Sequence, residues 1–260
     1  MSDIPPGDRS PFNQTPADFV QPSQRVELKV AAARPTVTYV LLGLNILIFL
    51  LQMGAEAVSG YDLLALYGMK INELIVDGEL WRLFTPMFLH GSITHLAFNM
   101  YALFIFGRGL ERYFGHFRFL LLYLLSGFAG NVISFAFSSS FSLGSSTSIF
   151  GLIAAEGVFF YRNRRLFPGQ ARSAITNIVM IAAINFVIGL SPGIDNWGHF
   201  GGLLGGLIFS WFAAPVMSLE GTPPSLSIRD TRDSGDTILA SAMVLIIFGV
   251  ITALLIINRT

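Results

Sequence analysis

The sequence predicts an all-α, polytopic membrane protein, on the basis of its composition and of the apolar segments that recur along it. Of 260 residues, 53% are hydrophobic and 12% are charged, whereas a soluble domain carries about 25% charged residues. The chain has no Cys, which excludes disulfides, thiolate nucleophiles and thiolate metal sites. Its formal net charge of +0 argues against nucleic acid as a partner. We expect no cofactor, and a lipid bilayer around most of the chain.

The first 34 residues differ from the rest because they are polar and contain several prolines. With no apolar periodicity, residues 1–34 are expected to form a disordered cytoplasmic tail. No short apolar core with a cleavage site follows the start, so the tail does not resemble a signal peptide.

Seven apolar segments then predict seven spanning helices. Six of them lie in a membrane domain of residues 35–216, and residues 237–260 hold the seventh helix and a short external tail. The polar residues 217–236 between these parts are expected to be a cytoplasmic linker. Several segments are shorter than the ~20 residues that span a bilayer. The predicted spans are 36–53, 93–107, 117–137, 146–161, 174–190, 197–214 and 237–257.

Two further features predict how the chain meets the membrane. Residues 60–89 mix apolar side chains with charged ones, so they are too polar to span and are expected to lie at the interface. With the N-terminus in the cytoplasm, 13 of the 16 basic residues fall on the cytoplasmic side, as the positive-inside rule requires. We therefore expect a multi-pass protein of a bacterial cytoplasmic membrane with its N-terminus inside.

The candidate chemistry comes from a hydroxyl and an imidazole at the starts of two apolar segments. Ser146 opens one segment and His199 another, and the predicted topology places both near the outer ends of their helices. The 16 residues from Ser146 to Arg162 make roughly 24 Å of helix, less than the hydrocarbon core of about 30 Å. Polar residues at membrane depth are costly and usually functional. Because Ser and His form an activated nucleophile, the pair suggests hydrolysis within the bilayer.

Four adjacent hydroxyls compete for the role of nucleophile, and the alternative is that they only cap a helix. Ser146 is favoured because Gly144 precedes it and Phe150 follows on the same helical face. A helix N-terminus also directs free N–H groups at a developing oxyanion. The four hydroxyls belong to Ser145, Ser146, Thr147 and Ser148.

The segment that contains His199 carries glycines at a spacing of four. Gly198, Gly202 and Gly206 lie on one stripe, which lets a neighbouring helix approach closely. A plain packing seam would explain this stripe as well, but close approach is also what a hydrogen bond from His199 to a serine on another helix requires. Asp195, one turn earlier, has two open roles: third member of a triad, or cap of the helix.

Polar residues on a third segment are expected at a similar depth. His95 and Asn99 are four residues apart, hence on one helical face, and neutral donors there would suit a tetrahedral intermediate. A metal site made of His90, His95 and His199 is the alternative. It is disfavoured, since no HExxH motif occurs and His90 and His95 are five residues apart rather than four.

Six short motifs follow one another between about residues 58 and 215. They are Trp81-Arg82, His90, His95-x-x-x-Asn99, Gly107-x-x-Leu110-Glu111, Gly144-x-Ser146 and Gly198-His199-x-x-Gly202-x-x-x-Gly206. In the order and spacing of these motifs the chain resembles the rhomboid family of intramembrane serine proteases. The resemblance implies that the first motif is structural.

The resemblance also implies the fold and the roles of the site residues. The fold would be a six-helix rhomboid-like core plus one additional C-terminal transmembrane helix. Ser146 and His199 would form a catalytic pair with no required Asp, and His95, Asn99 and the Ser146 backbone N–H would bind the oxyanion. Phe150 would pack against the His199 ring. The substrates would be single-span membrane proteins, cut near the outer face. The residues expected to support the site are His90, Gly144, Phe150, Gly198 and Gly202.

Two positions depart from the family pattern. The residue after the serine is usually Gly and here is Thr147, which is expected to tighten the loop and narrow the pocket. The residue before the histidine is usually Ala and here is Gly198. Thr147 keeps a catalytically inactive, rhomboid-like binding and quality-control factor as the alternative. A small transporter is disfavoured because the sequence shows no duplicated halves. The sequence predicts neither the physiological substrate nor the oligomeric state.

Overall fold

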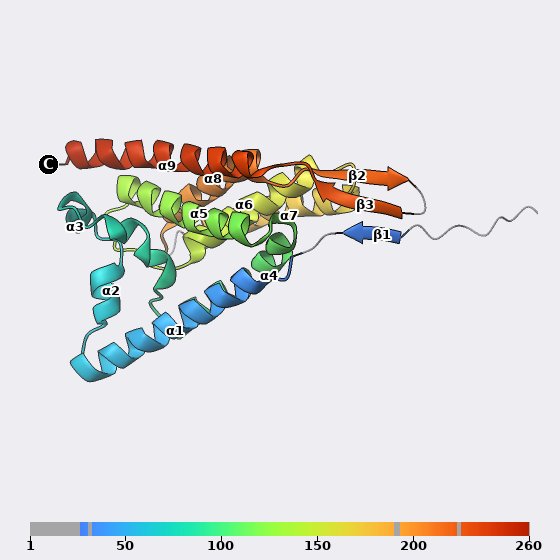
Figure 1. Ribbon diagram of the computed structural model, residues 1–260. Helices are drawn as coiled ribbons and strands as arrows, with labels where there is room; N and C mark the ends of the chain where they lie inside the picture. The colour runs from blue at the N-terminus through green and yellow to red at the C-terminus, as the bar shows by residue number, and fades with distance from the viewer. Residues whose placement is uncertain (1–26, 31–32, 190–192, 223–224, 260) are drawn as a thin grey trace, which may run out of the picture.

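The computed structural model describes residues 27–30, 33–189, 193–222 and 225–259, and it is mostly helical (Figure 1). A helix stands at each of the seven predicted positions, and four short helical turns fill the connection between the first two. The long helices are α1 (Thr36–Ser59), α4 (Ile93–Phe114), α5 (His116–Phe137), α6 (Ser146–Arg162), α7 (Pro168–Ile188), α8 (Asn196–Ala213) and α9 (Ser234–Ile257). The short ones are α2 (Leu63–Gly68), α3 (Asn72–Val76), η3 (Leu80–Leu83) and η4 (Thr85–Phe88).

Three helices in the described part of the chain are long and apolar enough to span a membrane, namely α1, α5 and α9. The number of helices that cross the bilayer therefore stays a prediction. Helix α6 has 17 residues, which makes roughly 25 Å of helix against a hydrocarbon core of about 30 Å. A spanning helix of this length begins beneath one surface of the bilayer.

Helices α5, α6 and α8 form the most closely packed part of the molecule, with α1 and α9 on opposite sides of them (Figure 1). Two glycine faces of α8 explain the close packing. A Cβ at Gly202 would collide with the backbone carbonyl of Thr147 on α6. On the other face, Gly201 lies against the backbone carbonyl of Ala129 on α5, and Gly205 lies against the Ala129 side chain. Backbones therefore touch directly, and van der Waals contact at this range stabilises helix pairs in lipid. The glycine spacing predicts the first face but not the second.

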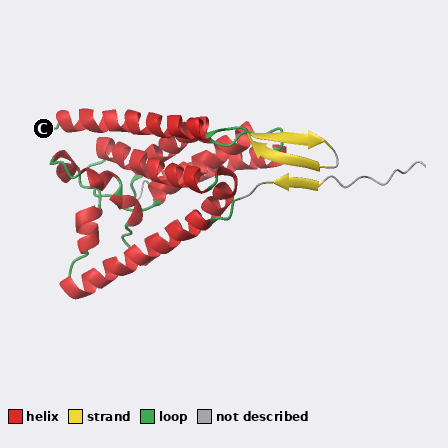
Figure 2. Cartoon of the chain, viewed as in Figure 1, coloured by secondary structure: helices red, strands yellow, loops and turns green. Residues whose placement is uncertain are grey.

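A three-stranded sheet differs from the prediction of an all-α protein (Figure 2). Its strands are β1 (Glu27–Val30), β2 (Met217–Thr222) and β3 (Ser225–Asp230). Their order is β1-β3-β2, with β2 antiparallel and β1 parallel to β3. The expected linker of residues 217–236 thus contains two strands, and the expected disordered tail of residues 1–34 contributes one. Tail residues 1–26 lie outside the described residues.

Each strand is four to six residues long, so it shows the period-2 alternation of a strand only two or three times. In β3 the alternation of Leu226 and Ile228 with serines is typical of a half-covered strand, and Ile228 is buried. In Figure 1 the sheet lies at one end of the molecule, and α2, α3 and the C-terminus lie at the other.

The connection between α1 and α4 is held by the buried guanidinium of Arg82. Its Nη1 donates to the backbone carbonyls of Leu66 (3.0 Å) and Met69 (2.8 Å). Its Nε lies 2.6 Å from a carboxylate oxygen of Glu79. These bonds satisfy carbonyls at the end of α2 that have no partner within the helix. Arg82 therefore has the structural role that the resemblance implies.

Glu111 joins α4 to the start of α1. Its buried carboxylate accepts hydrogen bonds from the backbone N–H groups of Val37 (2.8 Å) and Thr38 (2.7 Å) and from the Thr38 hydroxyl (2.6 Å). The first N–H groups of a helix lack partners within it, and a negative charge there is favourable. His116 Nδ1 lies 2.6 Å from the same carboxylate. One side chain thus caps α1 and fixes it against α4.

We predict that Glu111→Ala lowers the free energy of unfolding by about 3 kcal/mol, because buried N–H groups of α1 lose a charged acceptor. Thermal unfolding in detergent measures the loss. Glu56→Ala is the matched control, since Glu56 is an exposed carboxylate on the same helix α1. Equal midpoints for the two variants would contradict the capping role.

Candidate active site

Ser146 and His199 meet where α6 packs against α8. Ser146 is the first residue of α6, and His199 lies in the first turn of α8. His199 Nε2 is 2.9 Å from Ser146 Oγ, so the two side chains are hydrogen-bonded. Both are half-buried. The His199 imidazole is therefore close enough to accept the proton of the Ser146 hydroxyl, which is the geometry of an activated nucleophile.

The other three hydroxyls of the cluster have different surroundings. Ser145 Oγ is 3.3 Å from His90 Nε2. Ser148 Oγ lies 3.7 Å from the sulfur of Met87. Thr147 Oγ1 is buried and has no hydrogen-bond partner among the described residues. The hydroxyl bonded to His199 is therefore that of Ser146.

The plane of the His199 ring is set by stacking. The Phe150 ring lies parallel to it, with centroids 4.4 Å apart and an interplanar angle of 15°. Phe150 is one helical turn after Ser146, so the helix that carries the hydroxyl also orients the His199 ring. His199 Nδ1 is buried without a hydrogen-bond partner in the described part of the chain.

The sequence leaves two roles open for Asp195, third member of a triad or cap of the helix, and the structure shows the cap. Its Oδ1 accepts a hydrogen bond from the backbone N–H of Gly198 (2.9 Å), at the start of α8. Its Oδ2 accepts a hydrogen bond from the Ser134 hydroxyl. Neither oxygen bonds the His199 ring. Within the described residues the Ser146–His199 pair has no third member.

His95 and Asn99 lie beside the backbone that leads into α6. Gly144 has φ +133°, a conformation that favours glycine. A Cβ on Gly144 would come within 2.7 Å of His95 Nε2 and 3.6 Å of Asn99 Nδ2. The Asn99 Nδ2 is buried and has no partner among the described residues. Asn99 Nδ2 is thus an unpaired donor beside Gly144, two residues before Ser146, which is a suitable place to meet a developing oxyanion.

His90 packs against His95 and lies close to Ser145. It is 1% exposed, and its ring meets that of His95 edge-on with centroids 5.2 Å apart. Burial, with a smaller contribution from His95, lowers the pKa of His90 to about 3. The ring is therefore neutral at physiological pH, with one nitrogen as donor and the other as acceptor. The convergence of three His, Cys, Asp or Glu side chains that a metal would need does not occur in the described ranges.

Gln52 is a site-supporting residue that the sequence does not predict. Its amide oxygen accepts from the His90 backbone N–H (3.1 Å), and its Nε2 lies 3.2 Å from the His90 carbonyl. The Nε2 also donates to Asp62 (2.7 Å). An amide side chain near the end of an apolar segment is a signal of this role, but the sequence does not show which groups the Gln52 amide faces.

Thr147, which stands where the family usually has glycine, is packed between helices. It is 3% exposed. Its Cβ lies against Gly130 on α5, and its Cγ2 lies against Gly198 on α8, where an added Cβ would be 2.6 Å and 3.1 Å away. The side chain therefore fills space between helices that two glycines leave open.

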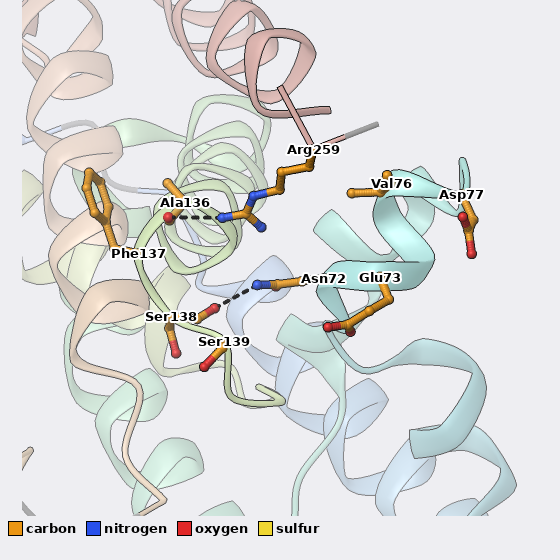
Figure 3. Close-up of a pocket in the computed structure, with 9 residues that line it drawn as sticks. All are labelled: Asn72, Glu73, Val76, Asp77, Ala136, Phe137, Ser138, Ser139 and Arg259. Atoms are coloured by element: carbon orange, nitrogen blue, oxygen red, sulfur yellow. Dashed lines mark hydrogen bonds between the residues drawn. The ribbon is translucent and has the colours of Figure 1, made fainter. Parts of the chain in front are cut away.

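A cavity of about 660 Å³ lies away from the pair, at the C-terminal end of α5 (Figure 3). Asn72 and Glu73 of α3 border it on one side, and Arg259, just beyond α9, borders it on another. Neither Ser146 nor His199 lines this cavity, so it is not part of the candidate active site.

Comparison with known proteins gives one family. A family model described as Rhomboid domain matches residues 77–216. Rhomboid protease GluP of Bacillus subtilis (strain 168) is 43% identical over 187 residues, which cover 72% of this chain and 36% of that protein. RHOMBOID-like protein 9, chloroplastic, of Arabidopsis thaliana is 36% identical over 59% of this chain and 36% of its own length. Rhomboid protease AarA of Providencia stuartii is 28% identical, over 72% of this chain and 74% of that protein. The chain spans about a third of the length of the first two relatives.

We predict that Gly202→Ala separates the pair, because the added methyl group would collide with the Thr147 carbonyl and push α8 from α6. The rate at which a fluorophosphonate labels Ser146 should fall about 10²-fold, as expected for a misplacement near 1 Å. The control is Gly109→Ala on α4, where an added Cβ meets no atom within 4 Å. If both variants label at the wild-type rate, the close approach does not position the pair.

Proposed function

The chain belongs to the rhomboid family, and we propose from this premise that it is an intramembrane serine endopeptidase. The observation that carries the proposal is the 2.9 Å hydrogen bond between Ser146 Oγ and His199 Nε2. Helices apolar enough to span a membrane place the protein in a bilayer. The match covers the region that contains the pair, so the family and the geometry concern the same residues.

In the proposed reaction the Ser146 hydroxyl attacks the carbonyl carbon of a peptide bond. His199 Nε2 takes the hydroxyl proton as the new C–O bond forms, and returns it to the leaving amine when the C–N bond breaks. The acyl group stays on Ser146 Oγ until water, deprotonated by the same nitrogen, attacks its carbonyl carbon. The proton then returns to Ser146 Oγ as the ester C–O bond breaks and the carboxylic acid leaves. Phe150 keeps the imidazole in one plane during both transfers.

The oxyanion of each tetrahedral intermediate is proposed to lie beside Gly144. Asn99 Nδ2 supplies a donor that has no other partner within the described residues. His95 Nε2 also lies beside Gly144. The Ser146 backbone N–H is at the start of α6, where N–H groups have no acceptor within the helix. Donors that are already fixed cost no reorganisation when the charge develops.

The proposed substrates are single-span membrane proteins, cut near the outer face of a bacterial cytoplasmic membrane in which the N-terminus of this chain is inside. A spanning helix shields its own carbonyls by hydrogen bonds, so it must open before Ser146 can reach one. Glycine and proline favour such opening. The tight packing of α6 and α8 around Gly202 favours a small residue at the cut site.

We predict that Ser146→Ala and His199→Ala each abolish cleavage of a generic single-span substrate in proteoliposomes. Ser145→Ala and Ser148→Ala are matched controls that should retain it, since those hydroxyls face His90 and Met87 instead of His199. Gel analysis of the substrate measures the cut. A dead Ser145→Ala beside an active Ser146→Ala would refute the assignment.

We predict that Asn99→Ala slows turnover by about 10²–10³-fold, the usual cost of one oxyanion donor. KM should change little, because the donor binds charge that exists only after attack. Thr176→Ala on α7 is the control, since that exposed hydroxyl bonds only its own helix. Wild-type kcat in Asn99→Ala would remove the proposed role.

A further inference from the structure

Lys70, in the connection between α2 and α3, carries a buried cation outside the active-site motifs. Its side chain is fully buried. Nζ donates to the Ser138 carbonyl (2.9 Å) and the Ser134 hydroxyl (3.1 Å) and lies 3.4 Å from the Ser134 carbonyl. All three oxygens are at the C-terminal end of α5, where a positive charge is favourable.

From Lys70 a chain of hydrogen bonds leads to the start of α8. The Ser134 hydroxyl accepts from Nζ and donates to Asp195 Oδ2. Asp195 Oδ1 in turn accepts from the backbone N–H of Gly198. Gly198 is the residue before His199, so this chain ends one residue from the candidate base.

The backbone of Lys70 leads to the start of α6. Its N–H donates to the Ser142 carbonyl (2.9 Å), and its carbonyl accepts from the Ser142 N–H (3.3 Å). Ser142 is four residues before Ser146. The Asn72 side-chain amide also donates to the Ser138 carbonyl (2.9 Å, Figure 3). Lys70 Nζ bonds the same oxygen. One residue thus ties the end of α5 to the starts of both helices that carry the pair.

Three charged groups act on the Lys70 ammonium, and the end of α5 that faces it contributes carbonyl and hydroxyl oxygens instead. Asp195 at the cap of α8 and Glu73 on α3 favour its charged form, and Arg259 beyond α9 disfavours it. Glu73 and Arg259 border the cavity in Figure 3. Burial is the largest effect and lowers the pKa of Lys70 to about 8. The cation opposite Asp195 is therefore present at neutral pH and is lost as pH rises through about 8.

We propose that Lys70 is a positioning residue, which holds the starts of α6 and α8 at the separation that the Ser146–His199 hydrogen bond requires. The inference rests on the proposed function, because it concerns the efficiency of that pair. Lys70 touches neither side chain and acts through Asp195 and Ser142.

A positioning role and a purely structural role differ in their response to pH. The pKa of Lys70 in the folded protein lies below its ordinary value, so the folded state loses this proton before the unfolded chain does. The free energy of unfolding therefore does not fall as pH rises past about 8 on account of this group. Turnover should fall over the same range, since Asp195 and the cap of α8 lose the opposing charge. Loss of activity without loss of stability marks positioning.

The test uses the full chain in proteoliposomes, with kcat, KM and thermal midpoint measured from pH 6 to about 10, a range that brackets the Lys70 transition. Lys70→Met should lower kcat about 10²-fold with KM within about two-fold. Lys70→Arg should restore most of the turnover and abolish the alkaline fall, because a guanidinium stays protonated. Arg259→Met is the control, since it removes the neighbouring cation; it should keep turnover and move the fall to higher pH.

Wild-type kcat in Lys70→Met would overturn the inference. If that variant does not fold, Lys70→Arg decides, because an alkaline fall near pH 8 that persists in it would also overturn the inference. Inactive wild-type protein that fluorophosphonate fails to label at Ser146 would instead overturn the proposed function, and the inference with it. Active wild-type protein with unaffected Lys70 variants would overturn the positioning role alone.

Discussion

The close approach of α8 to α5 and α6 is the constraint on which the rest of the structure depends. Helices in lipid gain little from hydrophobic association, so they are stabilised by contact between surfaces that fit. Glycines on two faces of α8 allow this contact to reach backbone distance. At Gly202 the neighbour is the carbonyl of Thr147, the residue after Ser146. The same contact that stabilises the helix pair therefore also brings the hydroxyl of one helix to the imidazole of His199 on the other.

Polar groups follow a second constraint, since a buried donor or acceptor without a partner is costly in an apolar environment. The Glu111 carboxylate, the Arg82 guanidinium and the Gln52 amide each bond backbone groups that helix ends or connections would otherwise leave unpaired. Several buried polar atoms of the described residues have no hydrogen-bond partner, and Asn99 Nδ2, beside Gly144, is one of them. That donor is therefore available to the proposed oxyanion.

The sequence predicts those features that repeat along a helix or that form a local pattern. Apolar segments predict the long helices, and glycines four apart predict the face of α8 that meets α6. The position of Ser146 at a helix start follows in the same way. The role of Asp195 and the place of Thr147 depend on residues of α5, which no local pattern identifies. The partners of Lys70 are largely backbone carbonyls, and a carbonyl is present at every residue, so composition and spacing carry no signal for it.

The absence of a bonded carboxylate at the His199 ring, within the described residues, fits the setting of the pair. A carboxylate fixed beside the imidazole at membrane depth would have to lose its water, and the cost of that loss can exceed the attraction it gains. Asp195 instead lies at the helix start, where a backbone N–H and the Ser134 hydroxyl bond its oxygens and the Lys70 cation opposes its charge. The imidazole is oriented by the face of Phe150, which needs no buried charge. Orientation and charge compensation thus come from different residues, an arrangement that suits the proposed two-residue site in an apolar environment.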